Sequence, residues 1–191
     1  MTATPTTRHI STARMGLGRA VLIGAAAGVL ASLLMAAYAM IGAWATGAGF
    51  FTPLYHIASL LIAPNAMMAS MHDAQAGAAF HLAFGPAAVG AVIHMATGAV
   101  YGAIFAVVVS RFAIRAALVV VAGVVWGALV FAFSTWIGLP AAAAILGAGD
   151  PIRNMAQMAG YGTFIIEHLL YGLVLGALVA LWGRQGSTTR T

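Results

Sequence analysis

The chain has 191 residues, of which 63% are hydrophobic and 6% are charged, and its formal net charge is +5. A water-soluble protein of this length needs more polar surface than this composition provides, so a soluble globular protein is excluded. The positive charge comes from arginines beside apolar segments rather than from a basic patch with stacking aromatic residues, which argues against nucleic-acid binding. The absence of cysteine excludes disulfides, thiolate metal sites and a cysteine nucleophile.

Four stretches are apolar and long enough to cross a bilayer as α-helices, which takes about 20 residues. They cover residues 20–44, 87–110, 116–137 and 161–182. Because they are apolar on every face, and do not alternate polar with apolar side chains, helices are favoured over the strands of a barrel. We predict an all-α integral membrane protein in which residues 20–183 form a single bundle of four transmembrane helices.

The arginines predict how this bundle is oriented. Seven of the eight flank the same set of helix ends: Arg8, Arg14, Arg19, Arg111, Arg115, Arg184 and Arg190. Under the positive-inside rule those ends are cytoplasmic, so both termini lie inside, with a disordered N-terminal segment 1–19 and a tail 184–191. The short turn at residues 111–115 predicts that the second and third spans are antiparallel neighbours.

The first outer connection, residues 45–86, is too apolar for a solvated loop. Thr52-Pro53 is a favourable helix start, because proline is well tolerated in the first turn, and we expect a short helix that runs through Ile62. A helix of this length cannot span the membrane. We expect it to lie in the interface or to fold over the bundle, with a buried face formed by Leu54, Ile57, Ala58 and Leu61.

Each predicted span contains one Gly-x-x-x-Gly pair, a spacing that lets helix backbones approach closely in lipid. The second and fourth spans both read His-x-x-x-Gly-x-x-x-Gly, which suggests a two-fold internal repeat with parallel halves. The pairs lie within about thirteen residues of their flanking arginines, in one band of the inner half of the membrane. The predicted packing glycines are Gly24, Gly28, Gly98, Gly102, Gly123, Gly127, Gly172 and Gly176.

His94 and His168 lead these repeated motifs, and Glu167 precedes His168. Ionisable side chains inside a bilayer are costly, so all three are candidate functional residues. In one interpretation they only hydrogen-bond across helices, for example Glu167 to His94. In the other, His94 and His168 face each other as ligands of haem or copper, with His81 or His56 nearby.

A second candidate metal set lies in the outer segments. Thioether and imidazole groups together suit Cu(I), although methionine is also an ordinary packing residue. The members are Met67, Met68, Met71, His72 and His81, with Asp73 beside them. Serine nucleophile elbows, phosphate loops and a membrane-embedded aspartate pair are absent, so we favour a role other than catalysis.

The stretch His168-Leu-Leu-Tyr-Gly-Leu-Val-Leu-Gly resembles a pattern in small four-span bacterial inner-membrane proteins of the YagU-like kind. The resemblance covers about nine residues. It implies location in a bacterial inner membrane and four spans, and it implies no particular activity or ligand.

These features lead to three functional hypotheses. The first is a membrane subunit or accessory protein whose glycines pack within the chain, in a homo-oligomer or against a larger complex. The second is a haem- or copper-binding protein that uses His94 and His168. The third is a small transporter or channel in which Glu167 relays a proton or cation.

Overall fold

The computed structural model describes residues 15–184, and every element in that range is helical. The predicted N-terminal segment 1–19 falls outside the described residues up to residue 14, and the predicted tail does so from residue 185. The first helix, α1, already begins at Leu17, so the last residues of the predicted N-terminal segment belong to the first span.

Four helices are long and apolar enough to cross a membrane, which confirms the predicted four-span fold. The first is α1, Leu17–Ala45, and the second is α4, Phe84–Val109. The third is continuous over Ala116–Leu146, and the fourth, α9, covers Tyr161–Arg184. The chain is therefore a multi-pass membrane protein, with the lipid bilayer as its surroundings.

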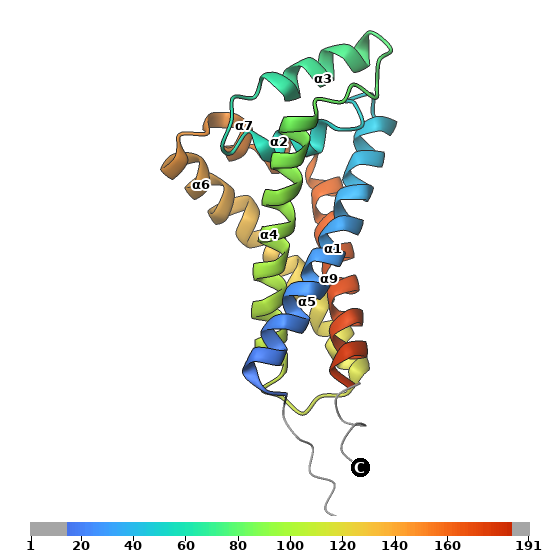
Figure 1. Ribbon diagram of the computed structural model, residues 1–191, viewed down its shortest axis with the longest axis vertical. Coiled ribbons are helices and arrows are strands. Elements are labelled where there is room, and N and C mark those ends of the chain that lie inside the picture. Colours follow the sequence, from blue (N-terminus) through green and yellow to red (C-terminus); the bar gives the residue numbers. More distant parts are fainter. Residues whose placement is uncertain (1–14, 185–191) are drawn as a thin grey trace, which may run out of the picture.

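The third span is longer than predicted, because it does not end at Ile137. It consists of α5, Ala116–Phe133, a π-helical turn η1, Ser134–Gly138, and α6, Leu139–Leu146. Pro140 lacks an N–H and its ring crowds the preceding turn, so a wider turn can continue where a regular α-helix would break. The helix ends where Gly147 adopts a positive φ of 67°. Figure 1 shows α6 leaving the bundle at an angle.

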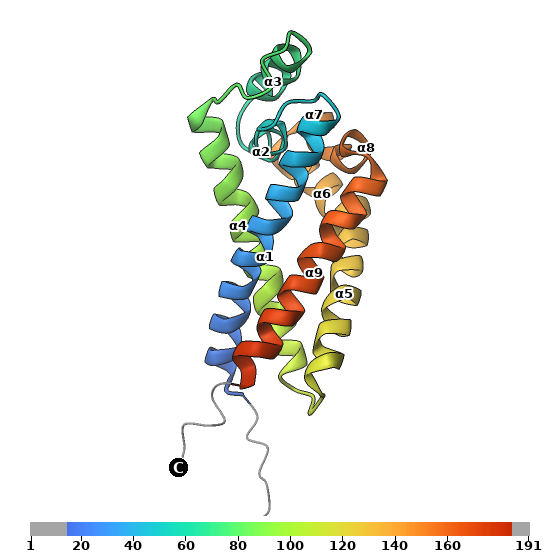
Figure 2. The ribbon, with the colours of Figure 1, turned by 90° about the vertical axis from the view of Figure 1, so that its right-hand side faces the viewer.

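The bundle is built from two helix pairs. α1 packs along α4, α5 packs along α9, and the two pairs join through α1 and α9. Figure 2 shows α4 and α5 on opposite sides, although the short turn near Arg111 connects them. The two spans are antiparallel and touch in the core between Phe105 and Trp126, but each packs more closely along its partner in the pair than along the other.

Both ends of the described chain lie at one end of the bundle, together with the α4–α5 turn (Figure 1). We call this the arginine end, because Arg19, Arg111 and Arg115 lie there, and the opposite one the cap end. A hydrogen bond from the Arg19 guanidinium to the Trp182 carbonyl, 3.1 Å, joins the start of α1 to the end of α9.

The cap end is covered by four short helices. They are α2, Thr52–Ala58, α3, Asn65–Gln75, α7, Gly149–Arg153, and α8, Met155–Ala159. Helix α2 confirms the short helix expected after Thr52, but it ends before Ile62.

The buried face of α2 agrees with the predicted one only in part, since Ala58 is buried and Leu54 and Ile57 are half-buried. Thr52, Tyr55, His56 and Ala58 are buried, whereas Leu61 lies beyond the helix and is 62% exposed. The helix folds over the bundle because its polar side chains find partners there, which the apolar periodicity of the segment did not indicate. Its Leu54 backbone lies against Gly90 of α4, where a Cβ atom would overlap the Leu54 carbonyl.

The glycine pairs lie where the helices of each pair cross. In the first pair, the space that a Cβ of Gly24 would fill is occupied by the carbonyl of Gly102, and that of Gly28 by the carbonyl of Gly98. In the second pair, Gly123 faces the carbonyl of Gly172 in the same way. Close backbone contact of this kind supplies dispersion energy between helices that have no hydrophobic drive to associate in lipid. Gly127 and Gly176 complete the second crossing.

The two crossings differ in register by one helical turn. If the halves are aligned on their His-x-x-x-Gly-x-x-x-Gly motifs, Gly28 corresponds to Gly127, and Gly98 corresponds to Gly172. Gly28 faces the Gly98 carbonyl, but Gly127 faces the carbonyl of His168, four residues earlier than Gly172. The proposed repeat is therefore offset by about 6 Å along the helix axis in one half.

Candidate functional site

A chamber of about 410 Å³ lies between the helices on the cap side of the glycine crossings. The glycines hold the backbones together at one level, and the larger side chains of the next turns keep the helices apart above it. α1, α4, α9 and the α5–α6 segment form its walls, and α2, α3 and α8 add side chains from the cap end. Its lining includes Ser32, His94, Tyr101, Glu167, His168 and Tyr171.

The chamber does not extend to the arginine end. Its lining stops at Gly98, Tyr101 and Tyr171, and below that level the helices enclose a packed apolar core. Phe105 of α4 and Trp126 of α5 lie in that core region with ring centroids 6.1 Å apart. The chamber is therefore a pocket confined to one half of the bundle.

The candidate residues His94, Glu167 and His168 all line this chamber. His94 comes from α4, and the other two come from α9, so the fold brings together residues that are more than seventy positions apart. The Glu167–His94 hydrogen bond considered from the sequence is not formed. The His94 ring instead bonds the Ser32 carbonyl of α1, 3.0 Å from Nε2.

Both imidazoles donate to backbone carbonyls. His94 uses Nε2 toward Ser32, and His168 uses Nδ1 toward Phe164 one turn earlier on α9, at 2.7 Å. A carbonyl oxygen only accepts, so each of these ring nitrogens carries the hydrogen. In the neutral tautomer that results, the second nitrogen of each ring is an acceptor. The Phe131 ring packs edge-on against His168, with centroids 5.9 Å apart.

Glu167 is the most unusual group in the chamber, because it is 5% exposed and its carboxyl group has no hydrogen bond to a described residue. No arginine of the described chain lies near it. Arg19, Arg111 and Arg115 are at the arginine end, and Arg153 is exposed at the cap end, 3.8 Å from Asp150. An uncompensated carboxyl group at this depth is costly, and such groups are typical of functional sites in membrane proteins.

Tyr171 is a chamber residue that the sequence analysis did not single out. It is buried, and its hydroxyl donates to the Gly98 carbonyl of α4 at 2.7 Å. The bond connects the two helix pairs directly above the glycine crossings. The spacing His168-x-x-Tyr171 places both side chains on one face of α9, so the sequence contained a signal that helical periodicity could have revealed.

His56 of α2 is a second residue with an unexpected role. It is buried, and its Nε2 lies 2.7 Å from the Pro151 carbonyl of α7, which ties the two halves of the cap together. Burial lowers the pKa of His56 below its ordinary value of 6.5, partly offset by the bond to Pro151. From the sequence alone, His56 is only a possible neighbour of the candidate histidines.

The five members of the candidate Cu(I) set do not point into one space. Met67 is buried and Met71 lines the chamber, whereas Met68 is 62% exposed. The His72 side chain is 83% exposed, on the outward face of α3. Residues four apart share a helix face, so Met67 and Met71 turn inward while Met68 and His72 turn outward.

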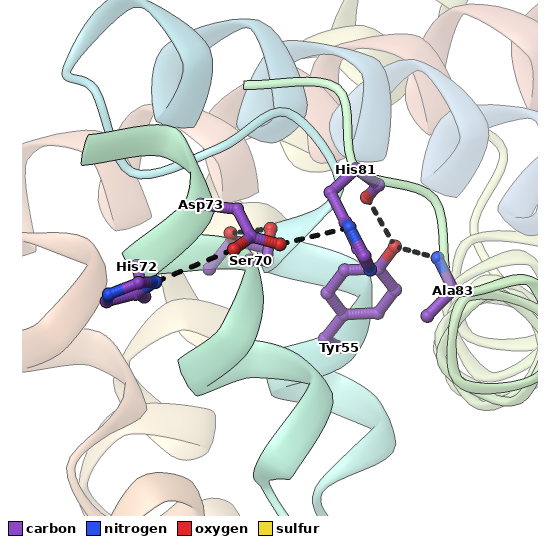
Figure 3. Close-up of polar contacts among 7 residues, drawn as sticks. Tyr55, Ser70, His72, Asp73, His81 and Ala83 are labelled. Carbon is purple, nitrogen blue, oxygen red and sulfur yellow. Dashed lines mark hydrogen bonds and ion pairs between the residues drawn. The ribbon is translucent and has the colours of Figure 1, made fainter. Parts of the chain in front are cut away.

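The two histidines of the candidate Cu(I) set make polar contacts with Asp73 on the outer surface of the cap. The carboxylate of Asp73 lies 3.0 Å from Nδ1 of His81 and 3.6 Å from Nδ1 of His72 (Figure 3). The Tyr55 hydroxyl donates to the His81 carbonyl and accepts from the Ala83 amide, at 3.0 and 2.8 Å. These contacts fasten α2 and α3 to the start of α4, so His81 holds the cap in place and lies outside the chamber.

Within residues 15–184, no three His, Asp or Glu side chains come together in an arrangement that could hold a metal ion. Comparison with known proteins adds nothing to this geometry, since no family model, curated protein or solved structure matches the chain.

Proposed function

We propose that this protein binds a small, largely apolar molecule within the membrane, in the chamber between its four spans. The chamber itself carries this proposal. A volume of about 410 Å³ falls in the range of ligand pockets, roughly 300–1,000 Å³. Apolar walls with a few polar groups are also characteristic of such pockets, and here those groups include the buried Glu167 and His168 and the half-buried His94.

The packing glycines favour ligand binding over the accessory-subunit hypothesis. Every Gly-x-x-x-Gly residue has a backbone or side-chain neighbour from another helix of the same chain, so these glycines are already used inside the bundle. A partner chain or second copy would have to dock on other surfaces. The proposal that the protein belongs to a larger complex therefore loses the feature that first suggested it.

The limited extent of the chamber favours ligand binding over transport through a channel. A channel needs a path that reaches both ends of the bundle, whereas this lining stops at the level of Gly98 and Tyr171. Haem or copper binding rests on His94 and His168 alone, each of which already uses one ring nitrogen on a carbonyl. An optical spectrum of the purified protein would reveal such a group directly.

We also propose a bacterial inner membrane as the location, with the arginine end in the cytoplasm. The arginine distribution supports this orientation. The resemblance of residues 168–176 to YagU-like inner-membrane proteins agrees with it. The chamber then lies in the outer half of the membrane, where it is covered by the cap helices.

Filling the chamber tests the proposal. Ala39 of α1 lines it, whereas Ala26 of the same helix is exposed on the lipid side, so Ala39→Phe and Ala26→Phe form a matched pair. Each protein would be reconstituted in nanodiscs and analysed by native mass spectrometry for a bound small molecule. We expect the wild type and Ala26→Phe to carry one and Ala39→Phe to lose it.

Two outcomes would overturn the proposal. In the first, Ala39→Phe and Ala26→Phe carry the small molecule equally often. In the second, the wild type carries no molecule and binds neither 1-aminoadamantane nor 1-hydroxyadamantane. Circular dichroism of Ala39→Phe checks that the bundle still folds.

A further inference from the structure

Five of the eight hydroxyl side chains that line the chamber donate their hydrogens to the protein's own backbone. Ser32 donates to Gly28, Thr97 to Ile93 and Tyr171 to Gly98, at 2.7 to 2.8 Å. Thr46 and Thr52 likewise donate to carbonyls of the preceding turn. A hydroxyl has one hydrogen to give, so these five groups can offer a ligand only lone pairs.

The ionisable groups have the same bias. His94 and His168 each donate one N–H to a carbonyl and have an acceptor nitrogen left, and Glu167 in its ionised form offers acceptors only. These three groups therefore present acceptors to the chamber, whereas the hydroxyl donors that the backbone does not use are those of Tyr101, Ser134 and Thr163. A ligand that satisfies the free acceptors of His94, His168 and Glu167 must bring hydrogen-bond donors.

The charge of Glu167 also favours a ligand that brings hydrogen-bond donors, in particular a cation. Glu167 is more than nine-tenths buried, lines the chamber and has no positively charged partner among the described residues. A cation bound beside it would replace the missing counter-charge, and charge-assisted hydrogen bonds are about twice as strong as neutral ones. An anionic ligand would meet a carboxylate and two acceptor nitrogens, which disfavours it.

We propose that the chamber recognises the ammonium group of a lipophilic primary amine, with the Glu167 carboxylate as its counter-ion and the His94 and His168 acceptor nitrogens as further hydrogen-bond partners. The inference rests on the proposed ligand-binding function and names its ligand class. The apolar walls, which include Met35, Ala39 and Phe164, would hold the hydrocarbon part. An ammonium group has three N–H donors, which matches three acceptors contributed by two helices.

Two rigid probes of equal shape separate charge from apolar fit: 1-aminoadamantane, an ammonium at neutral pH, and 1-hydroxyadamantane, which is neutral. Binding to the full chain in nanodiscs would be measured by isothermal titration calorimetry, with empty nanodiscs as the blank. We expect the amine to bind the wild type at least tenfold more tightly than the alcohol. In Glu167→Gln, which keeps the shape of the side chain, we expect the two affinities to differ less than twofold.

Asp73→Asn is the matched control, because it removes a carboxylate that contacts His72 and His81 outside the chamber. It should leave the tenfold preference unchanged. Equal binding of amine and alcohol by the wild type, or a preference that persists in Glu167→Gln, would overturn the ammonium proposal while leaving ligand binding intact. Binding of neither probe, together with no co-purified molecule, would overturn ligand binding itself.

Discussion

Single polar side chains, buried or half-buried, hold together helices that lie far apart in the sequence. Tyr171 links α9 to α4 through the Gly98 carbonyl, and His94 links α4 to α1 through the Ser32 carbonyl. Each bond satisfies a polar group that would otherwise be costly in an apolar surrounding. These residues therefore fix the width of the chamber as well as its chemistry.

His56 makes the attachment of the cap dependent on pH. Burial lowers its pKa in the docked state, so the undocked state binds the proton more readily. Docking is therefore fully stable above about pH 6.5, the reference pKa, and weakens as the pH falls below it, by at most about 1.4 kcal/mol per pH unit. Hydrogen exchange of the α2 amides, corrected for intrinsic rates, should show protection that decreases between pH 7 and pH 5.

The comparison variant is His56→Gln, whose side-chain amide can still donate to the Pro151 carbonyl but does not titrate. Its protection of α2 should not vary with pH. Parallel pH profiles in the two proteins would show instead that His56 does not control the docking.

The helices of each pair are in contact at glycines, so an added side-chain atom at these positions has no space. A Cβ on Gly24 would approach the Cα of Ala103 to 2.8 Å and overlap the Gly102 carbonyl, so α1 and α4 would have to move apart. Overpacking of this kind costs about 1–3 kcal/mol. We expect Gly24→Ala to lower the free energy of unfolding by that amount in mixed micelles titrated with sodium dodecyl sulfate.

Gly18→Ala provides the control, because Gly18 is on the same helix and has nothing within 4 Å of the added methyl group. Alanine is the better helix former, so this variant should equal the wild type or exceed it by up to about 1 kcal/mol. A Gly24→Ala protein as stable as Gly18→Ala would show that the crossing does not depend on close backbone contact.

Considered as a whole, the molecule has two dissimilar ends, and its lack of cysteine allows both to be labelled one at a time. Met68 in the cap and Phe112 in the α4–α5 turn are 62% and 63% exposed, so a cysteine at either position is equally accessible to a reagent on its own side. In bacterial spheroplasts, a membrane-impermeant maleimide should label Met68→Cys and leave Phe112→Cys unlabelled.

Lysis of the spheroplasts should expose Phe112→Cys to the reagent, which serves as the internal control. Labelling of Phe112→Cys in intact spheroplasts, with Met68→Cys protected, would reverse the proposed orientation and place the chamber in the cytoplasmic half of the membrane.

Hydrophobicity and length were sufficient to predict the four spans, because a helix that crosses lipid needs one long apolar run and little else. The same information did not show that the third span continues past Ile137. The π-helical turn before Pro140 depends on local backbone geometry rather than on apolar content. Nor did chain order reveal that α5 packs more closely on α9 than on α4, since a short turn constrains direction but not how closely two helices pack.

For the candidate site, burial cost alone drew attention to His94, Glu167 and His168, because charged or polar groups in an apolar span are rare enough to stand out. Only the tertiary structure decided which of their atoms remain free. Hydrogen bonds to Ser32 and Phe164 use one nitrogen of each ring, and Glu167 has no hydrogen-bond partner within residues 15–184. Such pairing depends on which helices pack together and at what register, and this follows from contacts between distant residues that no local pattern contains.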